Sequence, residues 1–249
     1  MTLVLLVRHG LTAVTGSVLS GWTPGLMLDD RGTAQAQALA ARLAPVPLDA
    51  IVTSPLERCV QTAAAIATSR QSVAFHRDER LGECKYGDWT NKPLKKLAKE
   101  PLWRVVQQHP SAVRFPGPGG ESMLDMQHRT VGAVRDWNSR LRPDAVYVIC
   151  SHGDVIKAIV ADALGLHLDQ YQRIQADPCS LTVIRYTPLR PFVVRMNDTG
   201  GDVAGLIRRD TGNLGRRGQS DGVVGGGAGQ GTTAAGAGGR EAITADAQG

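Results

Sequence analysis

Two histidines in this sequence follow short apolar segments and are themselves followed by glycine. Residues 3–7 lead into Arg8-His9-Gly10, and residues 145–150 lead into Ser151-His152-Gly153. If both segments are parallel strands, their carboxyl ends share one edge of the sheet, where open α/β sheets form their ligand crevices. Gly10 would then let the backbone approach a ligand closely. A single histidine at a strand end is more often a packed residue than a catalyst, so neither motif alone decides the chemistry.

An arginine and an acid lie between these two motifs. Arg58 follows a third apolar segment, residues 50–53, and Pro55 is predicted to occupy the first turn of the helix that carries Arg58. Glu83 lies in a glycine-punctuated loop, residues 81–89, from which its carboxyl group could donate or accept a proton. Taken singly, the two residues also fit an ordinary surface arginine and a solvated surface acid.

The combination of these groups indicates phosphoryl transfer. Arg8 and Arg58 would bind phosphate oxygens, and the imidazoles of His9 and His152 are predicted to lie at the same sheet edge. A neutral imidazole nitrogen is a competent nucleophile at neutral pH. Glu83 would supply the acid for the leaving oxygen. Cationic donors around the transferred group and one acid are what this reaction requires.

Sequence motifs spread over residues 1–199 carry a family resemblance. They are Arg8-His9-Gly10, Ser20-Gly21-Trp22, Leu28-x-x-Arg31-Gly32, Ser54-Pro55-Leu56-x-Arg58, Leu81-x-Glu83-x-x-x-Gly87-x-Trp89, Pro118-Gly119-Gly120-Glu121-Ser122 and Ser151-His152-Gly153. In order and spacing they resemble the histidine phosphatase superfamily, which includes the cofactor-dependent phosphoglycerate mutases. The chain is also similar to an actinobacterial subgroup of that superfamily whose members carry the label phosphomutase.

The resemblance implies a mechanism. His9 attacks the phosphorus and becomes phosphohistidine, while Arg8, Arg58 and His152 hold the phosphoryl oxygens. Glu83 is the proton donor and later the base. No metal takes part, and a bisphosphorylated primer is needed only if the enzyme is a mutase.

Some positions depart from the pattern of many relatives. Leu11 follows the first motif where an acid is common, and Thr15 stands where asparagine is common. The hydroxyl of Thr15, and Ser20 with the backbone of Gly21, are further candidates for binding phosphate. Asp154 follows the second motif where the glycolytic mutases tend to carry asparagine, and its charge disfavours a second phosphate.

We therefore favour phosphomonoester hydrolysis, with a phosphomutase of the phosphoglycerate type as the alternative. A mutase needs a cover that excludes water and a site for a doubly phosphorylated intermediate. The lysine-rich residues 91–115 could form such a cover or only a basic rim, and a solvated amphipathic helix face is the plainer interpretation. A second alternative is a non-catalytic phosphate-binding or protein-binding module that keeps the fold without turnover.

Composition limits the class of protein. The chain has 249 residues, 42% of them hydrophobic, which suits one catalytic domain. The net charge of +5 and the pI of about 9.2 favour a small phosphorylated metabolite over nucleic acid, because aromatic residues are only 4%. Four cysteines without a C-x-x-C pair predict neither zinc nor disulfides and suit the cytoplasm. We expect no signal peptide and no membrane-spanning helix.

The apolar pattern predicts an α/β fold of three layers, α/β/α, with a mostly parallel central sheet. Predicted strands cover residues 2–7, 50–53, 73–75 and 145–150, all apolar enough for burial on both faces, and a final pair covers 180–186 and 192–197. Predicted helices cover residues 31–43, 56–67, 122–141 and 155–164, the third capped near Glu121-Ser122.

The chain is predicted to divide into a catalytic domain, residues 1–199, and a Gly/Ala-rich disordered tail, residues 200–249. The substrate is expected to depend on the loops at 17–28 and 91–118, which pattern alone does not place. The sequence leaves the oligomeric state open, with a homodimer as the candidate assembly.

Overall fold

The computed structural model describes residues 1–70 and 72–200 of the chain, and the predicted tail lies outside them except for Gly200. The strands are β1 (Thr2–Arg8), β2 (Val18–Leu19), β3 (Ala50–Thr53), β4 (Ala74–Arg77), β5 (Lys92–Pro93), β6 (Val146–Ser151), β7 (Leu181–Tyr186) and β8 (Pro191–Asp198). The α-helices are α1 (Asp30–Leu43), α2 (Glu57–Ala67), α3 (Leu94–Leu97), α4 (Pro101–Gln108), α5 (Met123–Arg140) and α6 (Gly153–Ala163). Short 3₁₀ segments are η1 (Glu79–Leu81), η2 (Gly87–Trp89), η3 (Pro110–Ala112) and η4 (Leu168–Arg173).

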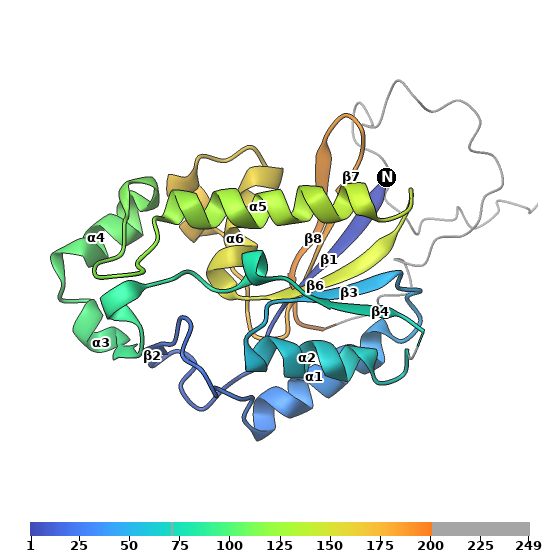
Figure 1. Cartoon of the computed structure of the whole chain (residues 1–249), viewed down its shortest axis with the longest axis horizontal. Helices are drawn as coiled ribbons and strands as arrows, with labels where there is room; N and C mark the ends of the chain where they lie inside the picture. The colour runs from blue at the N-terminus through green and yellow to red at the C-terminus, as the bar shows by residue number, and fades with distance from the viewer. Residues whose placement is uncertain (71, 201–249) are drawn as a thin grey trace, which may run out of the picture. The chain divides into compact units, whose positions relative to one another are not determined.

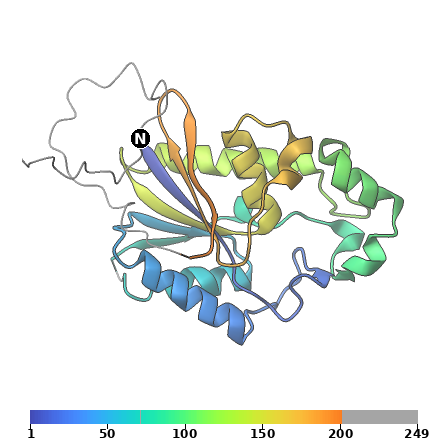
Figure 2. The same cartoon turned by 180° about the vertical axis from the view of Figure 1, so that it is seen from behind.

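The central sheet has the strand order β4-β3-β6-β1-β7-β8. The first four of these strands run parallel, and β7 and β8 add an antiparallel pair, visible at the edge of the sheet in Figure 2. Strands β1 and β6 are neighbours in the middle of the sheet, with Arg8 opposite Ser151. The two histidine motifs therefore emerge side by side at the same sheet edge.

Helices cover both faces of the sheet, as Figure 1 shows, with α5 and α6 on one side and α1 and α2 on the other. The alternation of side chains along β1 explains the two cores. Val4 and Leu6 pack on the α5–α6 side, and Leu5 and Val7 pack on the α1–α2 side, all fully buried. Burial of one such side chain contributes roughly 1.5–3 kcal/mol. The predicted three-layer α/β/α fold is confirmed.

Capping side chains fix the starts of α1 and α5. The Asp29 carboxylate accepts a hydrogen bond from the Gly32 amide at 2.8 Å. Ser122 and Asp125 form a reciprocal capping box, in which the Asp125 amide donates to Ser122 Oγ at 3.0 Å and the Ser122 amide donates to Asp125 Oδ2 at 3.3 Å. The cap predicted near Glu121-Ser122 is therefore present.

Every helix and sheet strand predicted from the sequence is present, with ends that differ by one or two residues. Two details were wrong. Pro55 lies before α2, because Leu56 is an extended N-cap and Glu57 is the first helical residue. Strand β4 is exposed along its whole length, whereas the sequence predicted burial on both faces, because β4 is the edge strand of the sheet.

The segment between β4 and α5 contains the elements that sequence patterns did not define. Here β5 pairs with β2 to form a two-stranded ribbon, and α3 and α4 follow it. Leu97 and Phe115 from this segment are buried in the core on the α5–α6 side. None of the helices in the described part of the chain is long and apolar enough to cross a membrane.

Candidate active site

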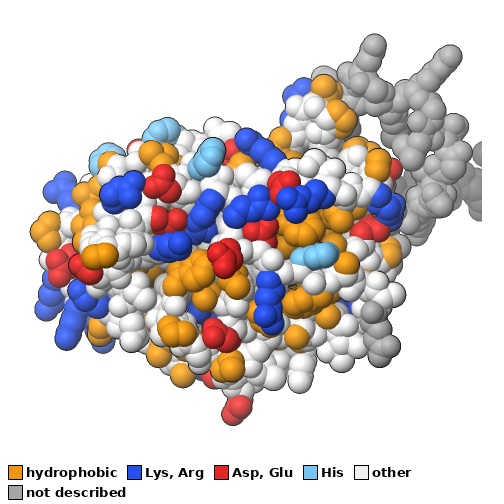
Figure 3. Space-filling model, viewed as in Figure 1, with side chains coloured by type: hydrophobic (Ala, Val, Ile, Leu, Met, Phe, Trp, Pro, Cys, Tyr) orange, Lys and Arg blue, Asp and Glu red, His pale blue; other side chains and the backbone are white. Residues whose placement is uncertain are grey.

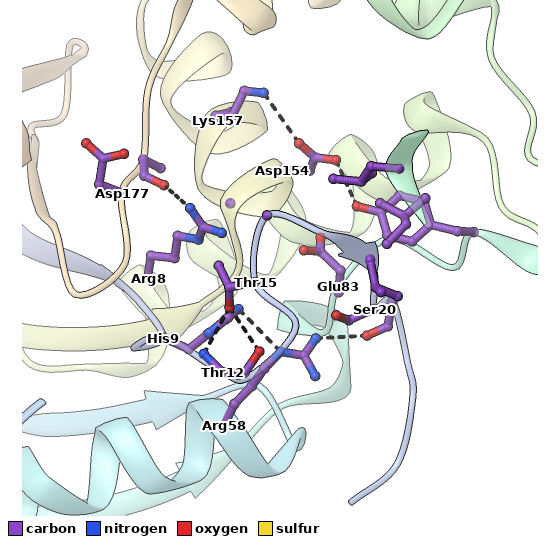
Figure 4. Close-up of a pocket in the computed structure, with 18 of the residues that line it drawn as sticks. Arg8, His9, Thr12, Thr15, Ser20, Arg58, Glu83, Asp154, Lys157 and Asp177 are labelled. Atoms are coloured by element: carbon purple, nitrogen blue, oxygen red, sulfur yellow. Dashed lines mark hydrogen bonds and ion pairs between the residues drawn. The ribbon is translucent and has the colours of Figure 1, made fainter. Parts of the chain in front are cut away.

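A cavity of about 420 Å³ opens where β1 and β6 end. All the predicted site residues except His152 line it, namely Arg8, His9, Thr15, Ser20, Gly21, Arg58 and Glu83. Arg8 is the last residue of β1, and Arg58 lies in the first turn of α2. His152 is the N-cap residue of α6, without a side-chain capping bond, and is fully buried. Figure 4 shows Arg8, His9, Arg58 and Glu83 around one space.

The imidazole of His9 is held in one orientation and one tautomer. Its Nδ1 lies 2.8 Å from the Gly10 carbonyl oxygen, which can only accept, so Nδ1 carries the proton. The other nitrogen, Nε2, therefore keeps its lone pair, and Arg58 Nε donates to it at 3.3 Å. Burial, and then the charges of Arg58 and Arg8, lower the pKa of His9 well below its usual range. At neutral pH, Nε2 is an unprotonated nitrogen that faces the cavity.

Arg58 connects His9 to His152. Its Nη2 lies 3.2 Å from His152 Nδ1 and donates to the Gly21 carbonyl at 2.8 Å. His152 Nε2 lies 2.8 Å from Ser54 Oγ, and the two histidine rings meet edge to face with centroids 5.2 Å apart. Burial and the nearby Arg58 lower the pKa of His152 as well. His152 is thus a neutral residue that orients the guanidinium.

Both arginines keep a buried N–H group available for an anion. Arg8 donates through Nη1 to the Ala176 carbonyl at 2.7 Å, but its Nε has no partner among the described residues. Arg58 Nη1 is likewise buried without a partner in that part of the chain. An unsatisfied buried donor is costly, and phosphate oxygens would satisfy both. The two guanidinium groups therefore form a site for a phosphoryl group beside His9 Nε2.

Glu83 faces this basic group from the other side of the cavity. Its side chain is only 12% exposed, and Oε2 lies 4.0 Å from His152 Nδ1. The Cys84 amide donates to Oε1 at 2.9 Å. Burial, followed by the negative charge of Asp154, raises the pKa of Glu83 to about 7. A carboxyl group that is partly protonated at neutral pH can act as a general acid and then as a base.

The remaining predicted residues form the cavity wall. The hydroxyl oxygen of Thr15 accepts from the Thr12 amide at 2.9 Å and lies 2.9 Å from Thr12 Oγ1. Ser20 accepts through its carbonyl from Thr23, and Gly21 contributes the carbonyl that holds Arg58. Thr12, which sequence reasoning missed, is thus the residue that fixes the Thr15 hydroxyl.

The role predicted for Gly10 was wrong. Gly10 does not line the cavity, and a side chain there would meet the Gly32 carbonyl oxygen at 2.6 Å. The glycine is needed because the start of α1 packs directly against the chain after β1.

The outer part of the cavity contains Asp154, which the sequence placed near the pocket, together with Tyr86, Lys157 and Gln172, which sequence reasoning did not assign. Asp154 Oδ2 accepts from the Tyr86 hydroxyl at 2.8 Å, and Asp154 Oδ1 lies 3.4 Å from Lys157 Nζ. Lys157 also donates to Gln172 at 2.5 Å. The sequence did carry a signal for this pair. Asp154 and Lys157 are three residues apart and follow a histidine at a strand end, so both lie on one helix face near the predicted site.

The lysine-rich segment lies at the rim. Lys92, Lys95, Lys96 and Lys99 are exposed, whereas Leu94 reaches the cavity wall. Figure 3 shows basic side chains gathered over the end of the molecule that carries α3. Within residues 1–70 and 72–200, no group of three or more His, Cys, Asp or Glu side chains could hold a metal ion.

Comparisons with known proteins agree with this chemistry. Residues 4–199 match the family model described as the histidine phosphatase superfamily, branch 1. Phosphoserine phosphatase 1 of Hydrogenobacter thermophilus is 29% identical over 210 residues, which cover 80% of this chain and 93% of the relative. A 2,3-bisphosphoglycerate-dependent phosphoglycerate mutase of Gloeobacter violaceus is 26% identical over 186 residues, 72% of this chain and 83% of the mutase.

A solved structure of a phosphatase is also similar to this chain in fold. The mycobacterial glucosyl-3-phosphoglycerate phosphatase in complex with VO3 superposes with a TM-score of 0.70 at 26% sequence identity. The match covers 79% of this chain and 98% of that one.

Proposed function

This chain belongs to the histidine phosphatase superfamily, branch 1, and we propose that it hydrolyses phosphomonoesters through a phosphohistidine on His9. The observation that carries the proposal is the unprotonated Nε2 of His9 beside the buried, unsatisfied N–H groups of Arg8 and Arg58. A nucleophile without a proton and free N–H donors for phosphoryl oxygens are the parts that phosphoryl transfer uses.

The proposed reaction has two steps. First, His9 Nε2 bonds to phosphorus, the ester P–O bond breaks, and Glu83 gives its proton to the leaving oxygen. Arg8 and Arg58 hold the phosphoryl oxygens, and His152 keeps Arg58 in place. In the second step the Glu83 carboxylate takes a proton from water, the hydroxyl oxygen bonds to phosphorus, and the N–P bond breaks to release orthophosphate.

The substrate is proposed to be a small phosphorylated metabolite. The cavity has room beyond the phosphoryl site, and the outer wall offers Asp154, Lys157 and Gln172 to the alcohol part of the ester. The names of the relatives include phosphoserine and glucosyl-3-phosphoglycerate phosphatases. The proposed location is the cytoplasm, which suits four buried free thiols. The proposed assembly is a homodimer, which light scattering would test.

Phosphomutase activity is the second candidate. It is favoured by the mutase among the relatives and by Leu94, through which α3 contributes to the cavity wall and provides part of a cover. Hydrolysis is preferred because the carboxylate of Asp154 stands in the cavity, where a second phosphate of the intermediate would be repelled.

The test is phosphate release from phosphoserine, the phosphoglycerates, glucosyl-3-phosphoglycerate, sugar phosphates and nucleotides, run beside an assay that couples 3- to 2-phosphoglycerate conversion. We expect release from at least one ester and loss of about 10³-fold or more in His9→Ala. His128→Ala, at an exposed histidine on α5, is the matched control.

The same assay decides between the candidates. Interconversion stimulated by a bisphosphate, with little phosphate release, would make the enzyme a mutase. Binding of phosphorylated ligands without turnover and without acid-labile phosphate on His9 would instead indicate a non-catalytic module.

A further inference from the structure

The loop that carries Glu83 has unusual backbone partners. The carbonyl groups of residues 80–83 belong to no strand, and a buried carbonyl must find a donor elsewhere. All four accept hydrogen bonds from side chains. Ser151 Oγ donates to the Leu81 carbonyl at 2.7 Å, and the guanidinium of Arg129 serves the other three.

Arg129, on α5, uses every N–H that its side chain has. Nη1 donates to the Arg80 and Gly82 carbonyls at 2.7 and 2.8 Å. Nη2 donates to the Glu83 carbonyl at 2.9 Å and to Glu121 Oε1 at 2.6 Å. Nε donates to Glu121 Oε2 at 3.0 Å. A guanidinium has five N–H donors in a fixed plane, and here each has its own acceptor.

Glu121 completes the contact on the far side of the acid. Its Oε1 accepts from the Lys85 amide at 2.8 Å, and its own amide donates to the Lys85 carbonyl at 2.9 Å. The Arg129–Glu121 pair is only 19% and 12% exposed. The pair therefore binds the backbone of Arg80, Gly82 and Glu83 and, two residues after the acid, the backbone of Lys85.

Trp22 holds the same carbonyl from a different loop. Trp22 Nε1 donates to the Glu83 carbonyl at 2.5 Å. The ring packs so closely on Gly82 that a side chain there would come within 2.2 Å of Trp22 Cζ2. Movement of the Glu83 backbone would break several short contacts at once.

We propose that Arg129 is a positioning residue for the proton donor, which fixes the backbone of residues 80–83 so that the Glu83 carboxyl reaches the leaving oxygen. This inference rests on the proposed role of Glu83. Arg129 does not line the cavity, so it acts through the loop and not on the substrate.

Other arginines on α5 are exposed and form surface ion pairs. Arg135 pairs with Asp162 and is 69% exposed, and Arg140 pairs with Asp136 and is 59% exposed. Among the described residues, both donate hydrogen bonds only to carboxylates and not to backbone carbonyls, and exposed pairs of this sort contribute little. Arg135 is therefore a matched control for Arg129.

The experiment measures kcat/KM for esters whose leaving groups range from p-nitrophenol through phenol to an alkyl alcohol. The proteins are the full-length wild type, Arg129→Lys, Glu83→Gln, the double variant and Arg135→Lys. Lysine keeps the charge opposite Glu121 but has three donors and no planar fork. Amide hydrogen exchange over residues 80–85 gives a second readout that does not depend on turnover.

For Arg129→Lys we expect the alkyl ester to slow about 10- to 100-fold and the p-nitrophenyl ester to change by less than about threefold. The double variant should be no slower than Glu83→Gln, because a misplaced acid has nothing further to lose. Exchange over residues 80–85 should be faster, and Arg135→Lys should match the wild type.

Equal slowing of all esters, or losses that multiply in the double variant, would overturn the positioning role. If Arg129→Lys does not fold, Glu121→Gln serves instead and should give the same leaving-group dependence with smaller losses. A wild type that releases no phosphate from any ester would overturn the proposed function, and hydrogen exchange would then still decide whether Arg129 holds the loop.

Discussion

The two sides of the cavity are built in different ways. On the basic side, His9, His152 and Arg58 stand at the ends of regular elements, β1, β6 and α2, whose backbones are paired in the sheet and helix. On the acidic side, Glu83 stands in an irregular loop whose carbonyls are satisfied by the side chains of Ser151, Arg129 and Trp22.

The two sides therefore depend on different interactions to position their functional groups. The position of the nucleophile follows from the register between β1 and β6, where Arg8 lies opposite Ser151, so local sequence and sheet topology are enough. The position of the acid depends on residues distant in sequence, because Arg129 lies 46 positions from Glu83. We expect damage on the basic side to slow all esters and damage on the acidic side to slow only poor leaving groups.

The largest effect is expected on the basic side. Arg58→Lys keeps a charge but loses the planar fork that contacts His9, the Gly21 carbonyl and His152. Loss of a preorganised donor to the transferred group costs on the order of 10²- to 10³-fold in rate. The predicted result is that kcat/KM falls by this factor for p-nitrophenyl and alkyl phosphates alike.

The matched control for this prediction is Arg31→Lys, at a side chain that is 72% exposed on α1. A loss in Arg58→Lys confined to alkyl esters would mean that Arg58 serves the leaving group, and the contrast between the two sides would fail.

A smaller effect is expected from adding a side chain at Gly82, in the loop that carries Glu83. In Gly82→Ala the new methyl group would lie 2.2 Å from Trp22 Cζ2, so the ring must move and weaken its bond to the Glu83 carbonyl. We predict about a tenfold loss on alkyl phosphates, little loss on p-nitrophenyl phosphate, and a changed Trp fluorescence spectrum.

Gly132→Ala is the control for that variant. Gly132 is an exposed residue of α5 with nothing within 4 Å of a new methyl group, and alanine there should stabilise the helix by roughly 0.5–1 kcal/mol. Unchanged alkyl-ester kinetics in Gly82→Ala would show that the loop tolerates a shift of Trp22.

The same contrast explains what could be predicted from sequence. The three-layer fold and the meeting of His9, His152 and Arg58 follow from apolar strands that end in polar motifs, because parallel strands share an edge. The burial of β4 was predicted wrongly, because an edge strand and a central strand of similar composition differ only in their neighbours.

The acidic side could be predicted only in part. Glu83 was identified by its residue type and motif, but its partners were not. The Pro118-Gly119-Gly120-Glu121-Ser122 motif was recognised without a role, and Arg129 carried no signal, because an arginine inside a helix is usually solvated. The five acceptors of Arg129 come from segments that only the tertiary fold brings together.

A change in pH tests the acid itself. Because burial and Asp154 raise the pKa of Glu83 to about 7, the protonated donor is lost as the pH rises through 7, and kcat/KM for alkyl phosphates should fall there. Asp154→Asn removes the neighbouring charge, so the pKa of Glu83 should drop and the fall should begin at lower pH.

The pH profile of Glu83→Gln supplies the baseline, since it contains only the titration of the substrate and of other groups. His9 should add no fall in activity near pH 6.5, because its pKa is well below that range. Identical profiles for Asp154→Asn and the wild type would show that Asp154 does not contribute to the raised pKa of Glu83 and that burial alone accounts for it.

The smallest effect on activity is expected from helix caps, which stabilise the fold without positioning the groups of the cavity. Asp29→Ala removes the cap of α1, and Ser122→Ala removes the cap of α5 at the residue next to Glu121. Each should lower the free energy of unfolding by about 1 kcal/mol, measured by denaturant titration. Arg129 lies two turns into α5, beyond the part of a helix that a cap controls, so both variants should keep wild-type kcat/KM on alkyl esters within about twofold. If Ser122→Ala slowed alkyl esters while Asp29→Ala did not, the start of α5 would belong to the acidic side, and Glu121 would depend on the cap as well as on Arg129.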